Sequence, residues 1–567
     1  MQISRRQLVG MVPALGLAPG LLAGEAPDLG EWNLAPAEVT ELERRAQKVI
    51  HDARVLRELP LANWPPALGY RPKVIQKPGF SDVGRLEAPA KRPPPPTPTD
   101  LCSLSIADAA ELLRLRAISS VDLTRAHLER IAQLDSELRT LITVSAEHAL
   151  AEAKRADEEI ARGRSRGPLH GIPISIKDCI ATAGIRTTYA CGAFADSVPG
   201  QDAAVVGRLR EAGAVLLGKA NLFEMCWVGT SEDGDFKPAR NPWNPKYPTG
   251  GSSTGSAVGV VAGLAMGSLG SDSGGSIRNP ASFCGATGLM PTYGLVSRGG
   301  VSDFAHSLGS IGPLARSAED TAILLAATAG HDATDPTSSS LPVPNYPDLI
   351  SRSLRGLRIG ICPSYMEAAG VDVEVRAALE AALDVFRSLG ATVADVQIPD
   401  LAYARATVWT ILLSEGLLTH FDLLGKQRER ISQRLFQGLA VGLFLSAQDY
   451  LRAQQARTLI ARQMERAFET LDILLTPSNP STAAPGTYRP EPKDRKIARS
   501  GEAYSTPANL YGNPAVSIPS GFNRLGLPMA IQLAGRPFDE ATVLTAAHQF
   551  QLATEWHRRR PGLGAIP

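Results

Sequence analysis

The sequence predicts an α/β protein built on a central mixed β-sheet covered by helices. Short apolar runs typical of buried strands alternate with helical patterns along most of the chain. Hydrophobic residues make up 44% of the 567 positions, enough for a large core. Although this length would allow more than one domain, no internal repeat is evident. We therefore expect one main domain, from residue 101 to 567.

The first 26 residues are expected to lie outside this fold. Arg5 and Arg6 precede a weakly apolar run that ends at Leu22, a pattern typical of a twin-arginine export signal. The alternative is a chance arginine pair before an irregular N-terminus. Pro27 disfavours a cut after Ala26, so retention as an anchor stays open. We expect an exported protein, periplasmic or secreted.

Residues 27–100 predict an extension wrapped on the main body. Apolar side chains recur at three- and four-residue steps, which predicts one amphipathic helix. They are Val39, Leu42, Ala46, Val49, Ile50, Ala53 and Leu56. The proline-rich residues 91–96 must form an extended linker. We assign no chemistry to this extension.

Helices and strands then alternate. The patterns predict helices at residues 122–134, 145–162 and 202–212, and buried strands at 171–178, 214–217 and 357–361. The strand at 214–217 lies in a sequence that imitates a phosphate-binding loop. Ala220 stands where that loop needs serine or threonine, so an ordinary strand explains it.

We expect residues 250–278 to form the functional centre. Two serine–glycine clusters, at residues 250–255 and 271–276, flank an apolar run at 257–265 that predicts a buried helix. Glycine lets backbone N–H groups converge on one oxygen atom, and a helix starting after Thr254 would direct unpaired N–H groups at the first cluster. A smooth helix face is predicted by Gly255, Gly259, Gly263 and Gly267.

Composition argues against several classes of function. The 58 basic and 57 acidic residues give a net charge of +1, so no global field favours nucleic acid or an anionic membrane. The apolar run at 257–265 is too short for a membrane span, which needs about 20 residues. Six scattered cysteines and nine histidines show no zinc or disulfide spacing. We expect no metal and no cofactor.

Residues 251–255 also match the G-x-S-x-G nucleophile elbow of α/β-hydrolases. That motif needs a strand running into its serine, whereas residues 244–249 are typical of a loop. The later histidines have no convincing acid partner in the sequence. We therefore set this hypothesis aside.

Lys177 together with GGSSTGS and SDSGGSIRNPASFCGATGLMPTYG closely resembles the amidase signature family. The resemblance covers roughly residues 101–555. It includes NPWNP at 241–245, LGSIGPLARSAEDT at 308–321 and ANLYGNPAVSIP at 508–519. It implies a single large, twisted mixed sheet with helices on both faces. It also implies an amidase that needs no cofactor.

Carried over residue by residue, the resemblance makes Ser276 the nucleophile, Ser252 the bridging serine with a cis peptide bond, and Lys177 the base. A serine hydroxyl is a weak nucleophile until a base takes its proton, and lysine can do so only when neutral. Desolvation favours neutral lysine. Considered alone, a lysine at a strand end usually extends to water; the serine clusters favour the catalytic role.

The resemblance also assigns supporting positions. The backbone N–H groups of Ser273, Gly274, Gly275 and Ser276 would form the oxyanion hole. Asp272 and Arg278 match positions that brace this loop by pairing. A glycine–serine turn without activity is the alternative for the whole set.

Three functions follow from these motifs. The first is a free-standing exported amidase that hydrolyses the C–N bond of a small linear amide, anilide, peptide amide or carbamate. Its only expected partner is that substrate, with no nucleic acid and no stable membrane insertion, and a homodimer stays open. The second is an A-type subunit of a glutamine amidotransferase acting on a tRNA-linked substrate, which the export signal opposes. The third is a degenerate binding protein.

Specificity is not defined by these motifs. Residues 416–460, which predict helices, and the polar loop 485–502 are candidates for a lid or substrate wall. An apolar pocket could include Phe223, Met225, Trp227 and Tyr504, although core packing is the simpler explanation for each. The acidic residues 232–235 depart from the family pattern and would favour a polar or cationic group at the substrate wall, and Thr254 replaces a frequent glycine.

Overall fold

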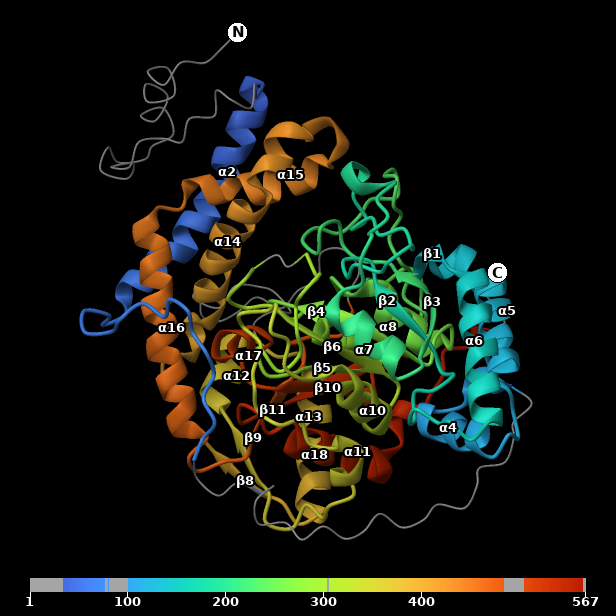
Figure 1. Cartoon of the computed structure of the whole chain (residues 1–567). Coiled ribbons are helices and arrows are strands. Elements are labelled where there is room, and N and C mark those ends of the chain that lie inside the picture. Colours follow the sequence, from blue (N-terminus) through green and yellow to red (C-terminus); the bar gives the residue numbers. More distant parts are fainter. Residues whose placement is uncertain (1–33, 77–79, 81–99, 303–304, 484–503, 564–567) are drawn as a thin grey trace.

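The computed structural model describes residues 34–76, 80, 100–302, 305–483 and 504–563 (Figure 1). The predicted export signal at residues 1–26, the proline-rich linker at 91–96 and the polar loop at 485–502 lie outside these described residues.

One mixed sheet of eleven strands lies at the centre of the described residues. Its strand order is β1-β3-β2-β4-β6-β5-β10-β11-β9-β7-β8. The strands are β1 (Leu141–Val144), β2 (Pro173–Lys177), β3 (Val215–Ala220), β4 (Gly267–Asp272), β5 (Thr287–Met290), β6 (Ser310–Ala315), β7 (Arg358–Ile361), β8 (Thr392–Asp395), β9 (Ile473–Pro477), β10 (Ala515–Phe522) and β11 (Pro528–Gly535). The predicted fold class is confirmed.

Parallel and antiparallel pairs divide this sheet into regions. β3, β2 and β4 are parallel neighbours, and so are β9, β7 and β8. The strands between these two groups pair antiparallel. Because parallel strands end at the same edge of a sheet, residues that follow β2 and β4 meet in space.

Helices cover both faces. Val215 and Leu217 of β3 belong to one buried cluster with α8, whereas Leu216 belongs to the other cluster. Successive strand side chains point to opposite faces, so both faces are packed. The helices are α2 (Pro36–Val55), α4 (Ile106–Arg114), α5 (Ser120–Leu138), α6 (Ala146–Ala161), α7 (Ala204–Glu211), α8 (Thr254–Ala262), α9 (Arg278–Cys284), α10 (Ala318–Thr328), α11 (Tyr346–Leu349), α12 (Pro363–Ala369), α13 (Val373–Ser388), α14 (Ala404–Lys426), α15 (Gln433–Ala440), α16 (Ala447–Ala467), α17 (Thr506–Tyr511) and α18 (Glu540–Thr554).

The strands predicted at residues 171–178, 214–217 and 357–361 are β2, β3 and β7, and the three predicted helices are α5, α6 and α7. The amphipathic helix of the extension is α2, which packs against α14 and α16 (Figure 1). Val39, Leu42 and Ala46 are among its buried residues, as their spacing predicts.

The apolar run after the first serine cluster is α8, and all nine of its residues are buried. The predicted glycine stripe is only partly correct. α8 ends at Ala262 because Gly263 adopts φ +73° and caps it, and Gly267 begins β4. Gly255 does allow close packing, since a β-carbon there would lie 2.1 Å from the Thr140 carbonyl oxygen.

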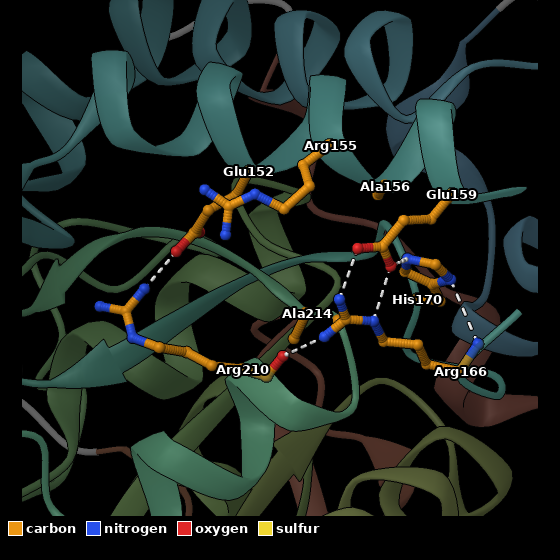
Figure 2. A pocket seen from close by; sticks show the side chains of 9 residues that line it. Glu152, Arg155, Ala156, Glu159, Arg166, His170, Arg210 and Ala214 are labelled. Carbon is orange, nitrogen blue, oxygen red and sulfur yellow. Dashed lines mark hydrogen bonds and ion pairs between the residues drawn. The ribbon is translucent and has the colours of Figure 1, made fainter. Parts of the chain in front are cut away.

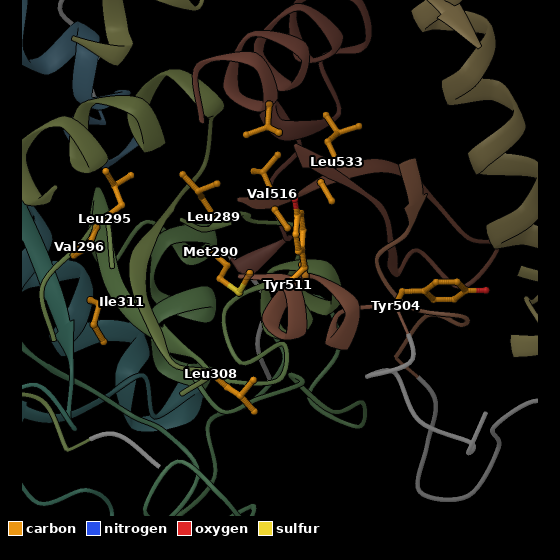
Figure 3. Packing of buried hydrophobic residues seen from close by; sticks show 14 of the residues in the cluster. Leu289, Met290, Leu295, Val296, Leu308, Ile311, Tyr504, Tyr511, Val516 and Leu533 are labelled. Atoms are coloured by element: carbon orange, nitrogen blue, oxygen red, sulfur yellow. The ribbon is translucent and has the colours of Figure 1, made fainter. Parts of the chain in front are cut away.

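The core on the side of β5, β10 and β11 packs aliphatic side chains from adjacent strands. Leu289, Val516 and Leu533 converge there, and Tyr511 of α17 lies against them (Figure 3). This packing holds α17 beside the sheet, close to the loop that carries the second serine cluster. Within the described residues, no helix combines the length and apolarity that crossing a bilayer requires.

Candidate active site

Lys177 is the last residue of β2, between β3 and β4. Its side chain is fully buried. The three preceding residues of β2 are apolar or small and also buried, so the strand carries the ammonium group into the protein instead of to water. Snorkelling to solvent is therefore excluded for this lysine.

The amino group of Lys177 contacts two serine hydroxyls. Lys177 Nζ donates to Ser252 Oγ at 2.7 Å and to Ser271 Oγ at 2.8 Å. The peptide bond between Gly251 and Ser252 is cis. A hydroxyl both donates and accepts hydrogen bonds, so Ser252 can pass a proton to or from the amine.

Ser252 and Ser276 lie on two loops that are bonded to each other. Gly251 N donates to Asn279 Oδ1 at 2.9 Å, and Ser253 N donates to the Ser276 carbonyl at 3.0 Å. Bonds on both sides of Ser252 therefore hold it beside the Ser276 turn. These bonds join the two loops through the Asn279 side chain and the Ser276 carbonyl, and within the described residues the Ser276 hydroxyl makes no hydrogen bond to Ser252.

Two glycines are required by this geometry. A β-carbon on Gly251 would lie 2.3 Å from the Phe223 ring, so only glycine lets the ring lie against this loop. Gly275 has φ +120°, and a β-carbon there would lie 2.4 Å from Ser505 Oγ. Larger residues at either position would displace the loop that carries a site serine.

Asp272 and Arg278 form a buried pair at the base of the Ser276 turn. Arg278 Nε donates to Asp272 Oδ2 and Arg278 Nη2 donates to Asp272 Oδ1, both at 3.0 Å. Burial alone would raise the pKa of Asp272, but the Arg278 charge and hydrogen bonds outweigh it and lower the pKa to about 2. The carboxylate stays ionised and clamps the turn.

Arg278 also joins this turn to the C-terminal part of the chain. Its Nη1 donates to the Ser505 carbonyl and to Gln532 Oε1, each at 2.8 Å. Asn509 of α17 accepts from Arg278 Nη2 at 2.6 Å and donates to Asp272 Oδ1 at 2.9 Å. The packing of α17 and β11 therefore holds the turn in place.

The expected oxyanion donors are not all alike. Gly275 N donates to Asp272 Oδ1 at 2.7 Å, so this N–H serves the clamp. The oxyanion hole expected from the N–H groups of this turn stays a prediction. Ser273, Gly274 and Ser276 are half-buried in the same turn, between β4 and α9.

Helices from residues 404–440 cover this turn. A β-carbon on Gly274 would lie 3.4 Å from Leu412 of α14, so α14 packs over the turn. Glu224, in the loop after β3, accepts a 3.0 Å bond from the backbone N–H of Ser432, which caps α15. Leu412 lies before the segment 416–460 predicted to be helical, and Ser432 within that segment bonds Glu224, so a lid or substrate wall at 416–460 stays a prediction.

Of the four candidate pocket residues, Phe223 lies against a site loop, with its ring beside Gly251. Met225 is buried, and Trp227 packs against Trp409 of α14 with ring centroids 4.9 Å apart. Tyr504 is buried edge-on against Tyr365. Glu232 pairs with Arg139 at 2.6 Å on the surface.

Sequence reasoning missed Ser271 as a lysine partner. Ser271 is the penultimate residue of β4, and β4 runs parallel to β2. That pairing was the only signal that could have placed it beside Lys177. Asn509 lies within a family motif, but the motif predicted no role for it.

A second cluster of charged residues lines a surface hollow between α6 and the loops near α7 (Figure 2). Arg166 binds Glu159 at 2.5 Å, and Arg210 pairs with Glu152. Each carboxylate therefore has an arginine partner, and the network holds α6 in place. No group of three His, Cys, Asp or Glu side chains suited to a metal ion occurs in the part of the chain that the structure describes.

Comparison with known proteins gives a consistent result. The profile of the Amidase family matches residues 122–544. The A subunit of glutamyl-tRNA(Gln) amidotransferase from Synechococcus sp. (strain CC9311) is 41% identical over 489 residues, which cover 82% of this chain and all of that protein.

Solved structures agree with the sequence comparison. The A subunit of glutamyl-tRNA(Gln) amidotransferase from Thermotoga maritima is 32% identical with a TM-score of 0.67, covering 80% of this chain and 95% of that one. The peptide amidase from Stenotrophomonas maltophilia is 30% identical with a TM-score of 0.71, covering 81% and 99%. The family match at residues 122–544 spans all eleven strands of the sheet and both serine loops.

Proposed function

Because the chain belongs to the amidase signature family, we propose that it hydrolyses the C–N bond of a carboxamide through a seryl acyl-enzyme. The observation that carries this proposal is the buried 2.7 Å hydrogen bond from Lys177 to Ser252, on a loop bonded to the Ser276 turn. A lysine among hydroxyls is suited to exchange protons with them.

In this mechanism the Ser276 hydroxyl attacks the amide carbonyl. Its proton passes to Ser252 as Ser252 gives its own proton to a neutral Lys177. The relay then runs in reverse and protonates the departing nitrogen. Water hydrolyses the acyl-enzyme at Ser276 by the same relay. Ser271, the second acceptor of the lysine, keeps the amine aimed at Ser252.

Backbone donors of the Ser276 turn would stabilise the oxyanion. We assign this role to the N–H groups of Ser273, Gly274 and Ser276, with Gly275 bonded to Asp272. A single donor of this kind is worth about 3–4 kcal/mol in the transition state. The clamp between Asp272 and Arg278 supports the role, because it fixes the turn before substrate binds.

The relatives favour a setting in which this activity belongs to a complex, with the chain as an A-type subunit of a glutamine amidotransferase. The relatives with this name are about 40% identical along 82% of the chain. We therefore place this setting first, which reverses the order expected from the sequence. Its partners would be other subunits and a tRNA-linked substrate, where the sequence alone favoured a small amide and no nucleic acid.

A free-standing exported amidase is the second candidate. The paired Arg5 and Arg6 support it, as does the likeness to a peptide amidase of known structure. The helix α2 precedes the matched family region and packs on α14, which gives this chain a covering element of its own.

Labelling with a fluorophosphonate tests the shared chemistry. We expect the label on Ser276 in the wild type and neither label nor amide turnover in Ser276→Ala. Full activity of Ser276→Ala would rule out the mechanism. A folded wild type that takes up no label would instead support a degenerate binding protein.

Two further measurements separate the settings. A tagged full-length chain is purified from its own host, and partner subunits are identified by mass spectrometry. The lone chain is then assayed on glutamine, aliphatic amides, anilides and peptide amides. Turnover only with partners supports the amidotransferase setting, whereas turnover alone supports the free amidase. Export of a reporter fused to residues 1–40, lost in an Arg5→Lys, Arg6→Lys control, would add to the second result.

A further inference from the structure

Two cysteines that lie far apart in the sequence meet beside Lys177. Cys179 follows β2, two residues after the lysine, and Cys226 lies in the loop after β3. Cys179 Sγ lies 3.7 Å from Ser271 Oγ, and Cys226 Sγ lies 3.8 Å from the same oxygen. Both are reduced thiols in this structure.

Ser271 links these thiols to the proposed base. The same hydroxyl oxygen accepts the 2.8 Å hydrogen bond from Lys177 Nζ. Each sulfur is therefore separated from the amine by one hydroxyl group. A change at either sulfur will therefore alter the position of the Ser271 hydroxyl, and through it the hydrogen bond to Lys177.

The two thiols are also neighbours, because both sulfurs lie within 3.8 Å of the same oxygen atom. The pKa of Cys179 is raised well above its usual value, first by a hydrogen bond with Cys226 and then by burial. Cys179 is fully buried, whereas Cys226 is half-buried and thus the more accessible of the two. Met225 and Cys226 have φ of +51° and +61°, a left-handed conformation that is costly for side chains other than glycine.

We propose that Cys179 and Cys226 form a redox modification site, in which a low-molecular-weight disulfide converts the dithiol to an internal disulfide. The loss of activity that follows rests on the proposed function of Lys177, but the modification itself does not.

The chemistry balances in two exchanges. The thiolate of Cys226 attacks the oxidant disulfide, a mixed disulfide forms, and one small thiol leaves. The thiolate of Cys179 then attacks the Cys226 sulfur, and the second small thiol leaves. The protein loses two protons and two electrons, and the oxidant is reduced to two thiols. The accessible Cys226 reacts first, and the buried Cys179 resolves the intermediate.

Bond formation would disturb the lysine site. The sulfurs of a disulfide lie about 2.0 Å apart, closer than any contact of two thiols. Drawing them together pulls both away from Ser271 and moves the strained loop at 225–226. The Ser271 hydroxyl then loses its two sulfur neighbours and is free to rotate, which changes its hydrogen bond with Lys177.

The test uses the full chain in buffers of oxidised and reduced glutathione, with dithiothreitol to reverse the reaction. Non-reducing digestion and mass spectrometry should find a peptide pair joined through Cys179 and Cys226. Amide turnover and fluorophosphonate labelling should fall about tenfold or more on oxidation and recover with dithiothreitol. The ratio of oxidised to reduced rate is compared within each variant.

Cys226→Ala should abolish both the linked peptide and the response of the rate to glutathione. Cys179→Ala should also abolish the linked peptide, but it should stop at a mixed disulfide with glutathione on Cys226. Cys362→Ala is the matched control, because the buried Cys362 sulfur also lies 3.7 Å from a serine hydroxyl, that of Ser364. This control should respond like the wild type. If Cys179→Ala fails to fold, Cys226→Ala carries the comparison.

Three results would overturn the proposal. The first is a wild type that forms no Cys179–Cys226 link under oxidation. The second is a wild type in which the mixed disulfide stays on Cys226. The third is a Cys226→Ala variant whose rate falls on oxidation as much as the wild-type rate does. Failure of the proposed amidase function would show separately, as absent turnover in the reduced enzyme. The peptide link would still be scored in that case.

Discussion

Two buried lysines on neighbouring strands differ in what they contact. Lys177 ends β2 and Lys219 lies in β3, which pairs with β2 so that Ile176 is opposite Lys219. Both side chains are fully buried. Lys177 donates to two serine hydroxyls, and no ion pair with a carboxylate is found for it among the residues that the structure describes.

Lys219 has a different environment. Its amino group donates to the Ile180 carbonyl at 2.5 Å and to the hydroxyls of Thr187 and Thr182 at 2.7 and 3.1 Å. It also lies 3.8 Å from Asp178 Oδ1. The pKa of Lys219 is lowered to about 8, mainly by burial and against the attraction of Asp178. This lysine ties down the loop that follows β2.

Lysine therefore serves two purposes in this sheet, proton exchange at one position and structural support at the other. Both lysines donate to two hydroxyls, which can exchange protons with an amine. Lys219 differs because it also donates to a carbonyl oxygen, which only accepts hydrogen bonds, and lies near a carboxylate that holds the cation in place. Lys177 is therefore placed for proton exchange, and Lys219 is placed to hold structure. Four substitution or titration experiments test these two roles.

The largest effect is expected from Lys177→Ala. Turnover should fall by about 10⁴-fold or more, because the base is lost and no neighbouring group can replace it. Steady-state kinetics on the best amide substrate measure this, and circular dichroism checks the fold. A rate within tenfold of wild type would refute the role of Lys177.

Ser252→Ala should be less severe, with a fall in turnover of about a hundredfold. The relay would lose its bridging hydroxyl, but Lys177 and the Ser276 turn would stay in place. The kcat of the variant is compared with that of Ser268→Ala, a buried serine on β4 that bonds Ser175 instead of the lysine. Equal losses in the two variants would contradict a specific relay at Ser252.

Lys219→Met should change stability more than chemistry. Removing one partner of a buried pair leaves Asp178 uncompensated, and we expect the free energy of unfolding to fall by about 3 kcal/mol. The double variant Lys219→Met, Asp178→Asn should recover part of that loss, because no unpaired charge remains. Urea unfolding measures both, and a double variant no more stable than the single one would argue against this pair.

The smallest effect concerns pH. The pKa of Lys219 is about 8 in the folded protein and lies near 10.5 for an ordinary lysine. Between these values the unfolded chain binds more protons than the folded one, so wild-type stability from this group should rise with pH. The double variant lacks the group, and its stability should rise less across pH 8–10.5. Parallel profiles would mean that Lys219 does not titrate in this window.

The sequence by itself was sufficient for local features. Apolar runs marked β2, β3 and β7, and the apolar run at 257–265 marked the buried helix α8, because burial leaves a direct trace in residue order. The motif resemblance identified the family, and the Lys177–Ser252 contact lies where that resemblance placed two of its residues.

Which side chains contact one another became clear only from the tertiary structure. Ser271 reaches Lys177, and Cys226 reaches Cys179, because β3, β2 and β4 are adjacent and parallel. Strand order leaves no periodic trace in the sequence, so neither contact was predictable. The use of the Gly275 N–H by Asp272 was equally hidden, since it depends on how Arg278 and Asn509 close the turn from distant parts of the chain.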